Sequence, residues 1–310
     1  MVTSGSSVFR LCEVIELLTF KQKNGEYEMK AAIMKLASGA FLVTTLLSSA
    51  WAGEPLALYD NFNSYVINPN RWFGHMSRAG AGLQTIDEVR FIILGNLNLL
   101  TRAYANTTTN DGDSYNNQGL SFINPGSITA IKTSIRVIGF ELKGCGNDDT
   151  TSRVRARIHG NFFNADIPTP GRAMNDVFAN ISLIRQINTT YSSSTLIVIF
   201  IIARCLDSSC LQFESLNETS LGTASVGQKV TLRLEWDKNR HQFIVQRDSQ
   251  PEVLIPYYVS DSSPPGVMES RRLDVGSWMA NCTAQPRPTA FMSAFFDDVY
   301  VNASALNIRQ

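Results

Sequence analysis

Three arginines and a histidine alternate with apolar residues in the segment "SRVRARIHGNFF", Ser152–Phe163. Successive side chains of a β-strand point to opposite faces, so these four share one face of the predicted strand: Arg153, Arg155, Arg157 and His159. Guanidinium groups bind carboxylates and sulfates with two parallel hydrogen bonds. A row of them is suited to holding an anionic glycan, and this row is the first candidate ligand site.

An ordinary solvated sheet face is the alternative for the same strand. Opposite charges on neighbouring strands commonly pair across a sheet, and exposed pairs of this kind contribute little to stability. On that hypothesis the arginines pair with acids such as Glu141 or Glu235. The two hypotheses differ in whether the guanidinium groups remain available to a ligand.

Aromatic residues in predicted loops are a second set of candidate ligand-binding residues. Trp278 lies in "VGSWMANC", and Tyr257 and Tyr258 open the Pro- and Ser-rich segment "PYYVSDSSPPG". Loops carry much of protein function, and an aromatic face can pack against a sugar ring. Trp72 and Trp236 stand at apolar positions instead, so we expect both in the core.

The cysteines indicate an oxidising compartment. Of five cysteines, Cys12 lies near the N-terminus and four remain: Cys145, Cys205, Cys210 and Cys282. An even number in an exported chain favours two disulfides. We expect Cys205–Cys210, because "CLDSSC" can close a turn between strands, which leaves Cys145–Cys282. Zinc binding is the alternative, but no CxxC pair is present and the three histidines are scattered.

The segment "MKLASGAFLVTTLLSSAWAGEP", Met34–Pro55, is typical of a secretory leader. Lys30 and Lys35 supply a basic region before the apolar stretch Leu36–Leu47, and Ala50-Trp51-Ala52 forms an A-x-A cleavage site. A membrane anchor is the alternative, but spanning a bilayer takes about 20 apolar residues. We therefore predict a signal peptide over 29–52, cleavage after Ala52, and a secreted or periplasmic protein of residues 53–310.

The first 28 residues do not suit a leader, because Met1–Glu28 contains four glutamates that a basic n-region normally lacks. Met29 opens "MKAAIMKL", a better start. We hypothesise that translation begins at Met29 and that residues 1–28 are a mis-called upstream extension of a bacterial gene.

Composition excludes some partners. Lys+Arg and Asp+Glu are both 27, so the formal charge is zero and nothing global favours nucleic acid or an anionic membrane. The longest apolar run after residue 53, "TLIVIFIIA" (Thr195–Ala203), is β-branched and too short to span a membrane, so we expect a buried strand and no membrane span in the mature chain.

Alternating segments dominate the rest of the chain. Expected strands are Asn96–Tyr104, Ile128–Leu142, Ser152–Phe163, Asn180–Asn188, Thr195–Cys205, Lys229–Asp237, His241–Asp248 and Phe295–Ala303. Turn-forming segments separate them, among them "NTTTNDGDSYNNQG", "GCGNDDTT", "CLDSSC" and "SDSSPPG". No fixed-period repeat is present. The pattern predicts a single all-β sandwich or jelly roll.

Three segments resemble one superfamily. The hairpin "VGQKVTLRLEWDKNRHQFIVQRD" (Val226–Asp248) is similar to a hairpin of the concanavalin A-like lectin/glucanase superfamily, the laminin G-like jelly rolls. "LYDNFNSYVINPNRWFG" (Leu58–Gly74) and "AFFDDVYVNA" (Ala294–Ala303) resemble the opening and closing strands of those domains. The resemblance implies one concanavalin A-like β-sandwich that either binds or cleaves a glycan.

No complete catalytic motif accompanies the resemblance. Laminarinase-type hydrolases of the superfamily carry E-x-D-x-x-E on one strand. Glu235 and Asp237 match its first half, but Arg240 stands in place of the second glutamate, and Asp237 begins a turn, where an aspartate normally bonds its own backbone. The arginine strand also resembles the Q-I-H strand of alginate-lyase-like jelly rolls, with Arg157 in place of the glutamine and no matching tyrosine motif.

The resemblance further implies a structural calcium ion where the opening and closing strands meet. Asp60 and Asn61 in the first, with Asp297 and Asp298 in the second, offer the oxygen ligands that calcium prefers, and Asp298 is the better expected ligand of the adjacent pair. The alternative is that both aspartates bond to backbone amides.

We therefore expect an exported, non-catalytic glycan-binding protein of the cell envelope or exterior. One alternative is a polysaccharide hydrolase or lyase that uses the Arg153–His159 face. The other is a structural envelope or matrix protein without a soluble ligand.

Overall fold

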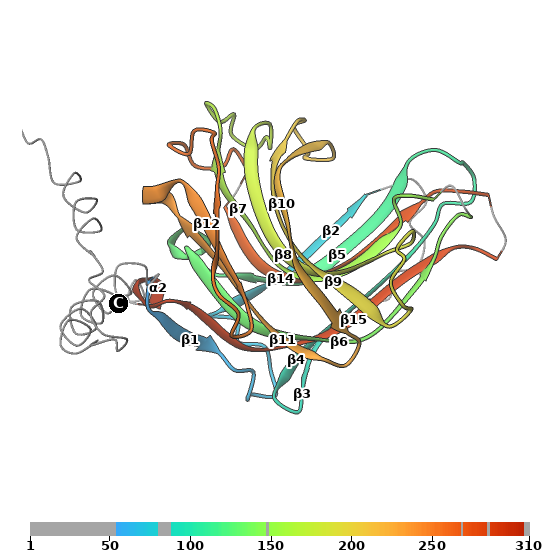
Figure 1. The fold of residues 1–310 in the computed structure, drawn as a ribbon, viewed down its shortest axis with the longest axis horizontal. Helices are drawn as coiled ribbons and strands as arrows, with labels where there is room; N and C mark the ends of the chain where they lie inside the picture. Colours follow the sequence, from blue (N-terminus) through green and yellow to red (C-terminus); the bar gives the residue numbers. More distant parts are fainter. Residues whose placement is uncertain (1–53, 80–87, 147–148, 268, 284–285, 307–310) are drawn as a thin grey trace, which may run out of the picture. The chain divides into compact units, whose positions relative to one another are not determined.

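Alternation of apolar and polar residues produces two antiparallel β-sheets packed face to face (Figure 1). The computed structural model describes residues 54–79, 88–146, 149–267, 269–283 and 286–306. The described strands belong to one unit that spans residues 53–310. The predicted extension (1–28) and signal peptide (29–52) lie outside the described residues and stay predictions.

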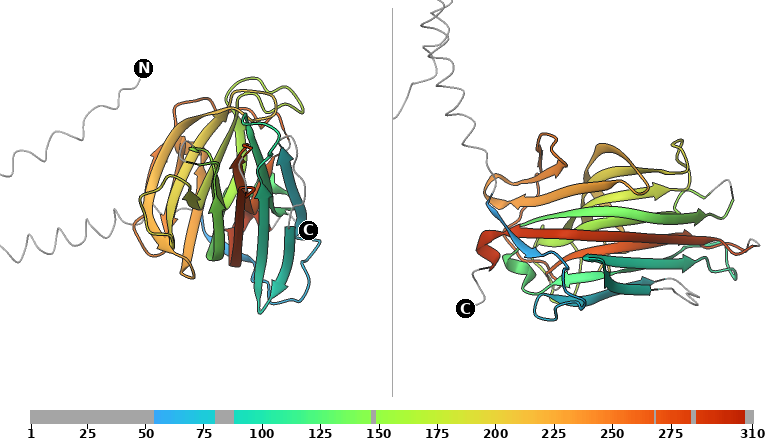
Figure 2. Two further views of the ribbon diagram at one scale, coloured as in Figure 1. Left: turned by 90° about the vertical axis from the view of Figure 1, so that its right-hand side faces the viewer. Right: turned by 90° about the horizontal axis from the view of Figure 1, so that it is seen from below.

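Sheet A has the order β13-β12-β11-β6-β15-β4-β3, and β1 pairs with β15 (Figure 2). Its strands are β1 (Leu56–Asp60), β3 (Glu88–Ile93), β4 (Asn96–Tyr104), β6 (Ala130–Lys143), β11 (Lys229–Asp237), β12 (Gln242–Arg247), β13 (Val253–Pro256) and β15 (Thr289–Asn302). The opening and closing strands of the domain are thus hydrogen-bonded neighbours.

Sheet B has the order β10-β9-β8-β7-β14-β5-β2. Its strands are β2 (Trp72–Ala79), β5 (Asp113–Phe122), β7 (Arg153–Asn164), β8 (Asp176–Gln186), β9 (Thr195–Cys205), β10 (Phe213–Ser225) and β14 (Ser270–Ala280). Short helical turns η2 (Pro125–Ser127) and η3 (Lys238–Arg240) and helix α2 (Ala303–Leu306) complete the described elements.

The core lies between the sheets, and alternation decides which residues enter it. On β7, Val154, Ala156 and Ile158 are fully buried, and on β14, Leu273 and Val275 are as well. From sheet A, the buried residues facing them include Leu232 and Leu234 of β11, Ile135 and Val137 of β6, and Phe296 of β15. Trp72 is buried in this core and Trp236 packs partly buried against it, as the sequence predicted.

The prediction of an all-β sandwich is confirmed, and the β-branched run forms strand β9. The strand is not fully buried as predicted, because Ile197, Ile199 and Ile201 on its outer face are only partly covered. One turn assignment is wrong. The segment "NTTTNDGDSYNNQG" contains the start of β5, a strand in which Ser114, Asn116 and Gln118 are buried. Ser114 and Asn116 are held by hydrogen bonds to Asn281 and Thr101. The segment was predicted as a turn because its residues are polar, although part of it is a buried strand.

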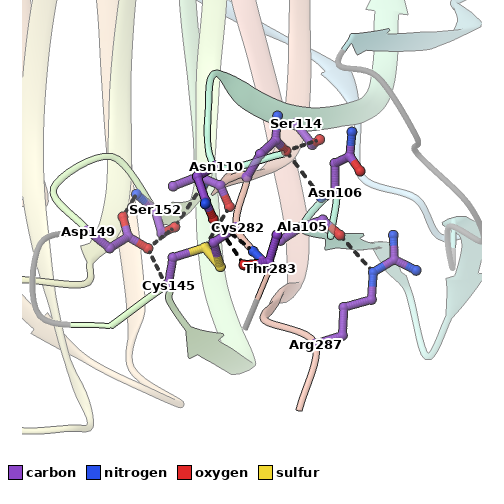
Figure 3. Close-up of a disulfide and its surroundings, with 12 residues drawn as sticks. Ala105, Asn106, Asn110, Ser114, Cys145, Asp149, Ser152, Cys282, Thr283 and Arg287 are labelled. Atoms are coloured by element: carbon purple, nitrogen blue, oxygen red, sulfur yellow. Dashed lines mark hydrogen bonds between the residues drawn. A yellow bond between two sulfur atoms is a disulfide. The ribbon is translucent and has the colours of Figure 1, made fainter. Parts of the chain in front are cut away.

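Both expected disulfides are present. Cys145–Cys282 joins the segment after β6 to the segment after β14 (Figure 3). Beside it, the carboxylate of Asp149 accepts hydrogen bonds from the Cys145 amide and from the amide and hydroxyl of Ser152. Burial raises the pKa of Asp149, but these hydrogen bonds outweigh burial and the net effect lowers it.

None of the described helices is long and apolar enough to cross a membrane.

Candidate functional site

The outer face of sheet B collects the polar side chains that alternate with the core. The strand register places three residues of β7 side by side with partners on β14: Arg155 opposite Gly276, Arg157 opposite Asp274, and His159 opposite Arg272. On the other side of β7, these three lie opposite Ile184, Ser182 and Asn180 of β8. The arginine row predicted from sequence therefore runs along the middle of a seven-stranded sheet.

A cleft of about 230 Å³ lies over this face, and we call it the sheet-B cleft. Its lining consists of Ser77, Tyr115, Asn117, Arg153, Arg155, Arg157, His159, Asn161, Ala173, Phe178, Asn180, Ile201, Cys205, Ser209, Cys210, Leu211, Phe213, Val267, Arg272 and Trp278. One end is cationic and the other is apolar. All four members of the predicted arginine and histidine row line it, as does Trp278.

A buried carboxylate organises the middle of the cationic end. Asp274 is fully buried and accepts two hydrogen bonds from Arg157, from Nε to Oδ1 at 2.5 Å and from Nη2 to Oδ2 at 3.1 Å. Nε of Arg272 also donates to Asp274 at 2.7 Å. Although burial alone raises the pKa of the Asp274 carboxyl, the charges of Arg157 and Arg272 outweigh it and hold the pKa far below its usual range. Asp274 therefore stays ionised, and its negative charge balances the positive charge of one of its two arginine partners.

The acids that the sheet-face alternative named are engaged elsewhere. Glu141 pairs with Lys143 at 2.9 Å, and Glu235 pairs with Arg233. The arginine row does have a cross-strand acid, as that alternative proposed, but the acid is Asp274 of β14.

Arg155 reaches over the neighbouring strand to a neutral partner. Its Nη2 lies 3.3 Å from the side-chain oxygen of Asn117 on β5, two strands away. The path crosses Gly276, where an added Cβ would lie 2.2 Å from that oxygen and 3.2 Å from Nε of Arg155. Arg155 forms no ion pair with any described carboxylate. Burial, followed by the charges of Arg157 and Arg153, lowers the pKa of Arg155 well below its ordinary value.

Arg153 completes a row of stacked planar groups. Its guanidinium lies 4.5 Å from the ring centroid of Trp278, and Trp278 stacks on Tyr115 with centroids 4.7 Å apart and an interplanar angle of 11°. Tyr115 and Arg153 lie opposite Trp278 on the two strands that flank β14. The indole is therefore packed on both sides, and it positions Arg153 rather than offering a free face to a sugar.

Two histidines in this region are kept neutral. His159 is 5% exposed, and its Nδ1 has no hydrogen-bond partner among the described residues. Burial and the charges of Arg272 and Arg157 lower the pKa of His159 well below its ordinary value. His75 of β2 has an unpartnered buried Nε2, and burial together with Arg272 lowers its pKa to about 4. Two imidazoles without charge thus lie among the arginines.

The apolar end of the cleft is formed by a separate hydrophobic cluster. It contains Ala173, Phe178, Ala203 and Cys205, with Ile201, Cys210 and Val267 packed against them. Leu211 and Phe213 add side chains that are 49% and 42% exposed. The His159 ring lies 5.5 Å from that of Phe178, so His159 marks the boundary between the two ends.

The predicted tyrosines of the Pro- and Ser-rich segment do not lie at this site. Tyr257 is 4% exposed and packs against Phe163 and Phe243, so the prediction that it stacks on sugars is wrong. Its hydroxyl accepts a hydrogen bond from Nε1 of Trp236 and donates one to Asp261, which explains its burial. Tyr258 is 93% exposed and is not part of the cleft lining.

Carboxylates suited to hydrolysis do not line the cleft. None of its described lining residues is an aspartate or glutamate. Glu235 and Asp237 are on β11, in the other sheet, and Asp237 accepts a hydrogen bond from the Arg240 amide, as expected of a turn-opening aspartate. The partial hydrolase motif therefore has a structural role.

The residues proposed for calcium are engaged in other contacts. Asp60 accepts hydrogen bonds from Nε1 of Trp72 at 2.7 Å and from the Phe62 amide at 2.9 Å. The ammonium of Lys229 lies 3.5 Å from Asp297 and 3.4 Å from Asp298. Asn61 accepts a hydrogen bond from the Asn63 amide at 3.3 Å.

These contacts fit a hydrogen-bonded strand end better than a calcium cage, since a lysine already supplies the positive charge next to the adjacent aspartates. Among the described residues, no group of three or more His, Cys, Asp or Glu side chains is placed to hold a metal ion. The calcium hypothesis itself stays untested.

Sequence reasoning missed half of the cationic end. Asp274 and Arg272 lie on β14, and Asn117 and Tyr115 lie on β5, strands that were not predicted. The signal for β14 was present in the alternation of Leu273 and Val275 with charged neighbours.

No protein-family model matches the chain, and no curated protein matches its sequence. Solved structures to which it is similar include LamAcat from Zobellia galactanivorans, at 13% identity over 77% of this chain and 97% of that chain, with a TM-score of 0.36. A GH16 protein of the Bacteroides ovatus mixed linkage glucan PUL has 12% identity, coverage of 78% and 97%, and a TM-score of 0.37. The alginate lyase from Klebsiella pneumoniae has 12% identity, coverage of 68% and 83%, and a TM-score of 0.33. At these identities and TM-scores the likeness is weak, and the fold is described by the structure itself as an all-β sandwich of two antiparallel sheets.

Proposed function

We propose that the sheet-B cleft binds an acidic glycan without cleaving it, and that the protein does so outside the cytoplasm. The observation that carries this proposal is the excess of guanidinium groups on one sheet face: Arg153, Arg155, Arg157 and Arg272 line the cleft, Asp274 pairs with two of them, and the charge of Asp113 acts on Arg153. Alternate residues of a strand are spaced about 7 Å apart, and Arg153 and Arg155 are the two members of the row that keep partial exposure to a polymer lying along β7.

Arg155 is the residue we expect to contact the anion most directly. Arg157 and Arg272 already share Asp274, whereas the one hydrogen-bond partner of the Arg155 side chain among the described residues is the neutral Asn117. A sugar carboxylate or sulfate placed against Arg155 would replace a weak contact with charge-assisted hydrogen bonds. Such bonds contribute about 1.5–3 kcal/mol each, which corresponds to roughly tenfold to hundredfold in affinity.

Export is part of the proposal. Both disulfides are of the kind that persists in oxidising compartments, and the leader predicted over residues 29–52 would direct the chain there. N-terminal sequencing of the exported protein tests this directly, with Gly53 expected as the first residue.

Binding is tested with an array of neutral, carboxylated and sulfated polysaccharides at several salt concentrations. We expect binding of acidic members only, weakened by salt because the contacts are between charges. Arg155→Gln should weaken binding at least tenfold. The matched control is Arg136→Gln on β6 of sheet A, where the guanidinium lies over the Phe295 ring, and it should bind as wild type. Equal binding by both variants would reject the cleft as the binding site.

A lyase is the second candidate function, and His159 is the observation that favours it. His159 lines the cleft with a neutral imidazole, beside arginines that can neutralise a uronate carboxylate. In such a reaction His159 would remove the proton from the carbon next to the carboxylate. The electron pair would form a carbon–carbon double bond as the glycosidic oxygen leaves with a proton from water. Appearance of unsaturated uronate with wild type, and its loss in His159→Gln, would establish this activity in place of pure binding.

A further inference from the structure

We propose that the apolar end of the sheet-B cleft receives an acyl substituent of the glycan, an O-acetyl group being the smallest that fits this chemistry. This inference rests on the proposed function, because it adds an acyl group to the acidic glycan proposed as the ligand. The cleft is continuous from the arginines to Phe178, Leu211 and Phe213, so a single ligand contacts both ends.

The apolar end offers aliphatic and aromatic contacts in addition to the charged contacts that the acidic groups of a glycan make. Its members are side chains of Ala173, Phe178 and Val267 together with the Cys205–Cys210 disulfide. Leu211 and Phe213 remain 49% and 42% exposed there, whereas Ala173, Phe178 and Cys205 are buried. Covering apolar surface is favourable by about 25 cal/mol per Å², so a methyl-bearing group on the ligand adds affinity at this end.

The boundary residue suits the polar part of an ester. His159 lines the cleft between the arginines and Phe178. A neutral imidazole carries one N–H, from which an ester carbonyl oxygen accepts a hydrogen bond. Phe178 and the apolar side chains packed with it then lie next to the methyl group of the ester.

The wall of the apolar end is built by hydrogen bonds between three loops. The Ala173 amide donates to the Ser208 carbonyl at 2.9 Å, which ties the disulfide loop to the segment before β8. The carboxylate of Asp176 receives the amides of Gly266 at 2.6 Å and Val267 at 3.0 Å. Asn164 adds a third bond to Asp176 at 2.6 Å. These contacts hold the wall in place before a ligand arrives, which reduces the entropy lost on binding.

The spacing fixes where the substituent lies along the polymer. Arg157 and His159 are two residues apart on β7, about 7 Å, and Arg155 is about 13 Å from His159. The charged groups therefore belong to sugars along the arginine row, and the acylated sugar lies at the disulfide-loop end. A ligand with acidic groups but no acyl group would fill only the cationic end.

The test uses three acidic polysaccharides that carry O-acetyl groups: bacterial polymannuronate, xanthan and homogalacturonan. Each is measured as isolated and after mild alkaline removal of its esters. We expect at least one to bind wild type roughly tenfold more tightly in the acetylated form, about 1.4 kcal/mol. Leu211→Asn should remove that preference, so that the acetylated and de-esterified forms bind the variant equally. Leu206→Asn is the matched control, a leucine 43% exposed in the same loop but outside the cleft lining.

The outcomes separate the two proposals. Equal binding of acetylated and de-esterified polymers, or an unchanged preference in Leu211→Asn, overturns the acyl inference while acidic glycan binding stands. Failure of every acidic polymer to bind in either form overturns the proposed function and the inference with it. Loss of preference in Leu206→Asn as well would show that the loop, not the Leu211 contact, is responsible, and would also overturn the inference.

Discussion

Arg157 and Asp274 form a bidentate ion pair across β7 and β14 in which both side chains are almost completely shielded from solvent, at 4% and 0% exposure. Two buried charges cost much desolvation energy, and a good geometry repays that cost only while both are present. Arg272 joins the same carboxylate at 2.7 Å. The pair thus fixes the strand pairing at the middle of the cleft and leaves one guanidinium in excess.

Replacing Asp274 by Asn should destabilise the protein strongly, because two guanidinium groups would stay buried without a counter-charge. We expect a loss of about 3–5 kcal/mol in the free energy of unfolding, measured by urea denaturation. Asp297→Asn is the control, since its contact with Lys229 is at 3.5 Å and both side chains are partly exposed. That variant should lose less than about 1 kcal/mol. Similar losses in the two variants would contradict the assigned importance of the buried pair.

Acidification should destabilise the fold through the neutral histidines. The pKa of His75 is lowered from 6.5 to about 4 in the folded protein, so the unfolded state binds a proton first as the pH falls. Stability attributable to His75 is present above pH 6.5 and is lost as the pH falls toward 4. The slope is at most about 1.4 kcal/mol per pH unit for each such group.

The variant His75→Gln isolates this contribution. It should show a shallower decline of the free energy of unfolding between pH 6.5 and pH 4 than wild type, and a comparable value at pH 8, where the wild-type imidazole is neutral in both states. An NMR titration of the His75 ring gives the folded-state pKa independently. Identical slopes in the two proteins would contradict the shifted pKa.

The sequence predicted one side of the cleft because chemistry and alternation coincide there. On β7 every inward residue is apolar and every outward residue from Arg153 to His159 is charged or titratable, so the face could be assigned without a structure. On β14 and β5 the outward residues include Gly276 and Asn117, residue types that are also common in turns. Their role depends on which strand lies beside β7, and long-range strand order is not encoded in local alternation.

The apolar end of the cleft could not be predicted from the sequence, for a related reason. Phe178, Leu211 and Val267 come from three separate segments that meet only through the pairing of β8 and β9 and through the bonds of Asp176. The disulfide Cys205–Cys210 was predicted correctly from its spacing. Nothing in that spacing indicated that the closed loop would form the wall of a ligand site.

The long-range disulfide should contribute more stability than the short one. Cys145 and Cys282 are 137 residues apart, whereas Cys205 and Cys210 are 5 apart. In the chain-entropy account a bridge stabilises by restricting the unfolded chain, so removing Cys145–Cys282 as a double serine variant should cost about 3–5 kcal/mol. The matching Cys205–Cys210 variant should cost about 2 kcal/mol. Free thiols in the exported wild-type protein, detected by alkylation and mass spectrometry, would contradict the presence of both bridges.

Chelation should leave the melting temperature unchanged if the observed contacts of the acidic residues are complete. Lys229 supplies one positive charge beside Asp297 and Asp298, and Asp60 accepts hydrogen bonds from Trp72 and the Phe62 amide. We therefore expect no change with EDTA and none with added calcium, followed by differential scanning fluorimetry. A fall with EDTA that calcium reverses would instead support the calcium site that the superfamily resemblance implies.

Removing the indole of Trp278 should weaken glycan binding by releasing Arg153. The guanidinium lies 4.5 Å from the ring centroid, and a contact of this kind at a partly exposed site contributes about 0.5–1 kcal/mol. Trp278→Leu should therefore lower the affinity for an acidic glycan roughly twofold to fivefold. Because the indole acts through Arg153, the double variant Trp278→Leu/Arg153→Gln should bind no more weakly than Arg153→Gln alone. Additive losses would show that Trp278 contacts the sugar itself, and they would restore the stacking role that the sequence predicted.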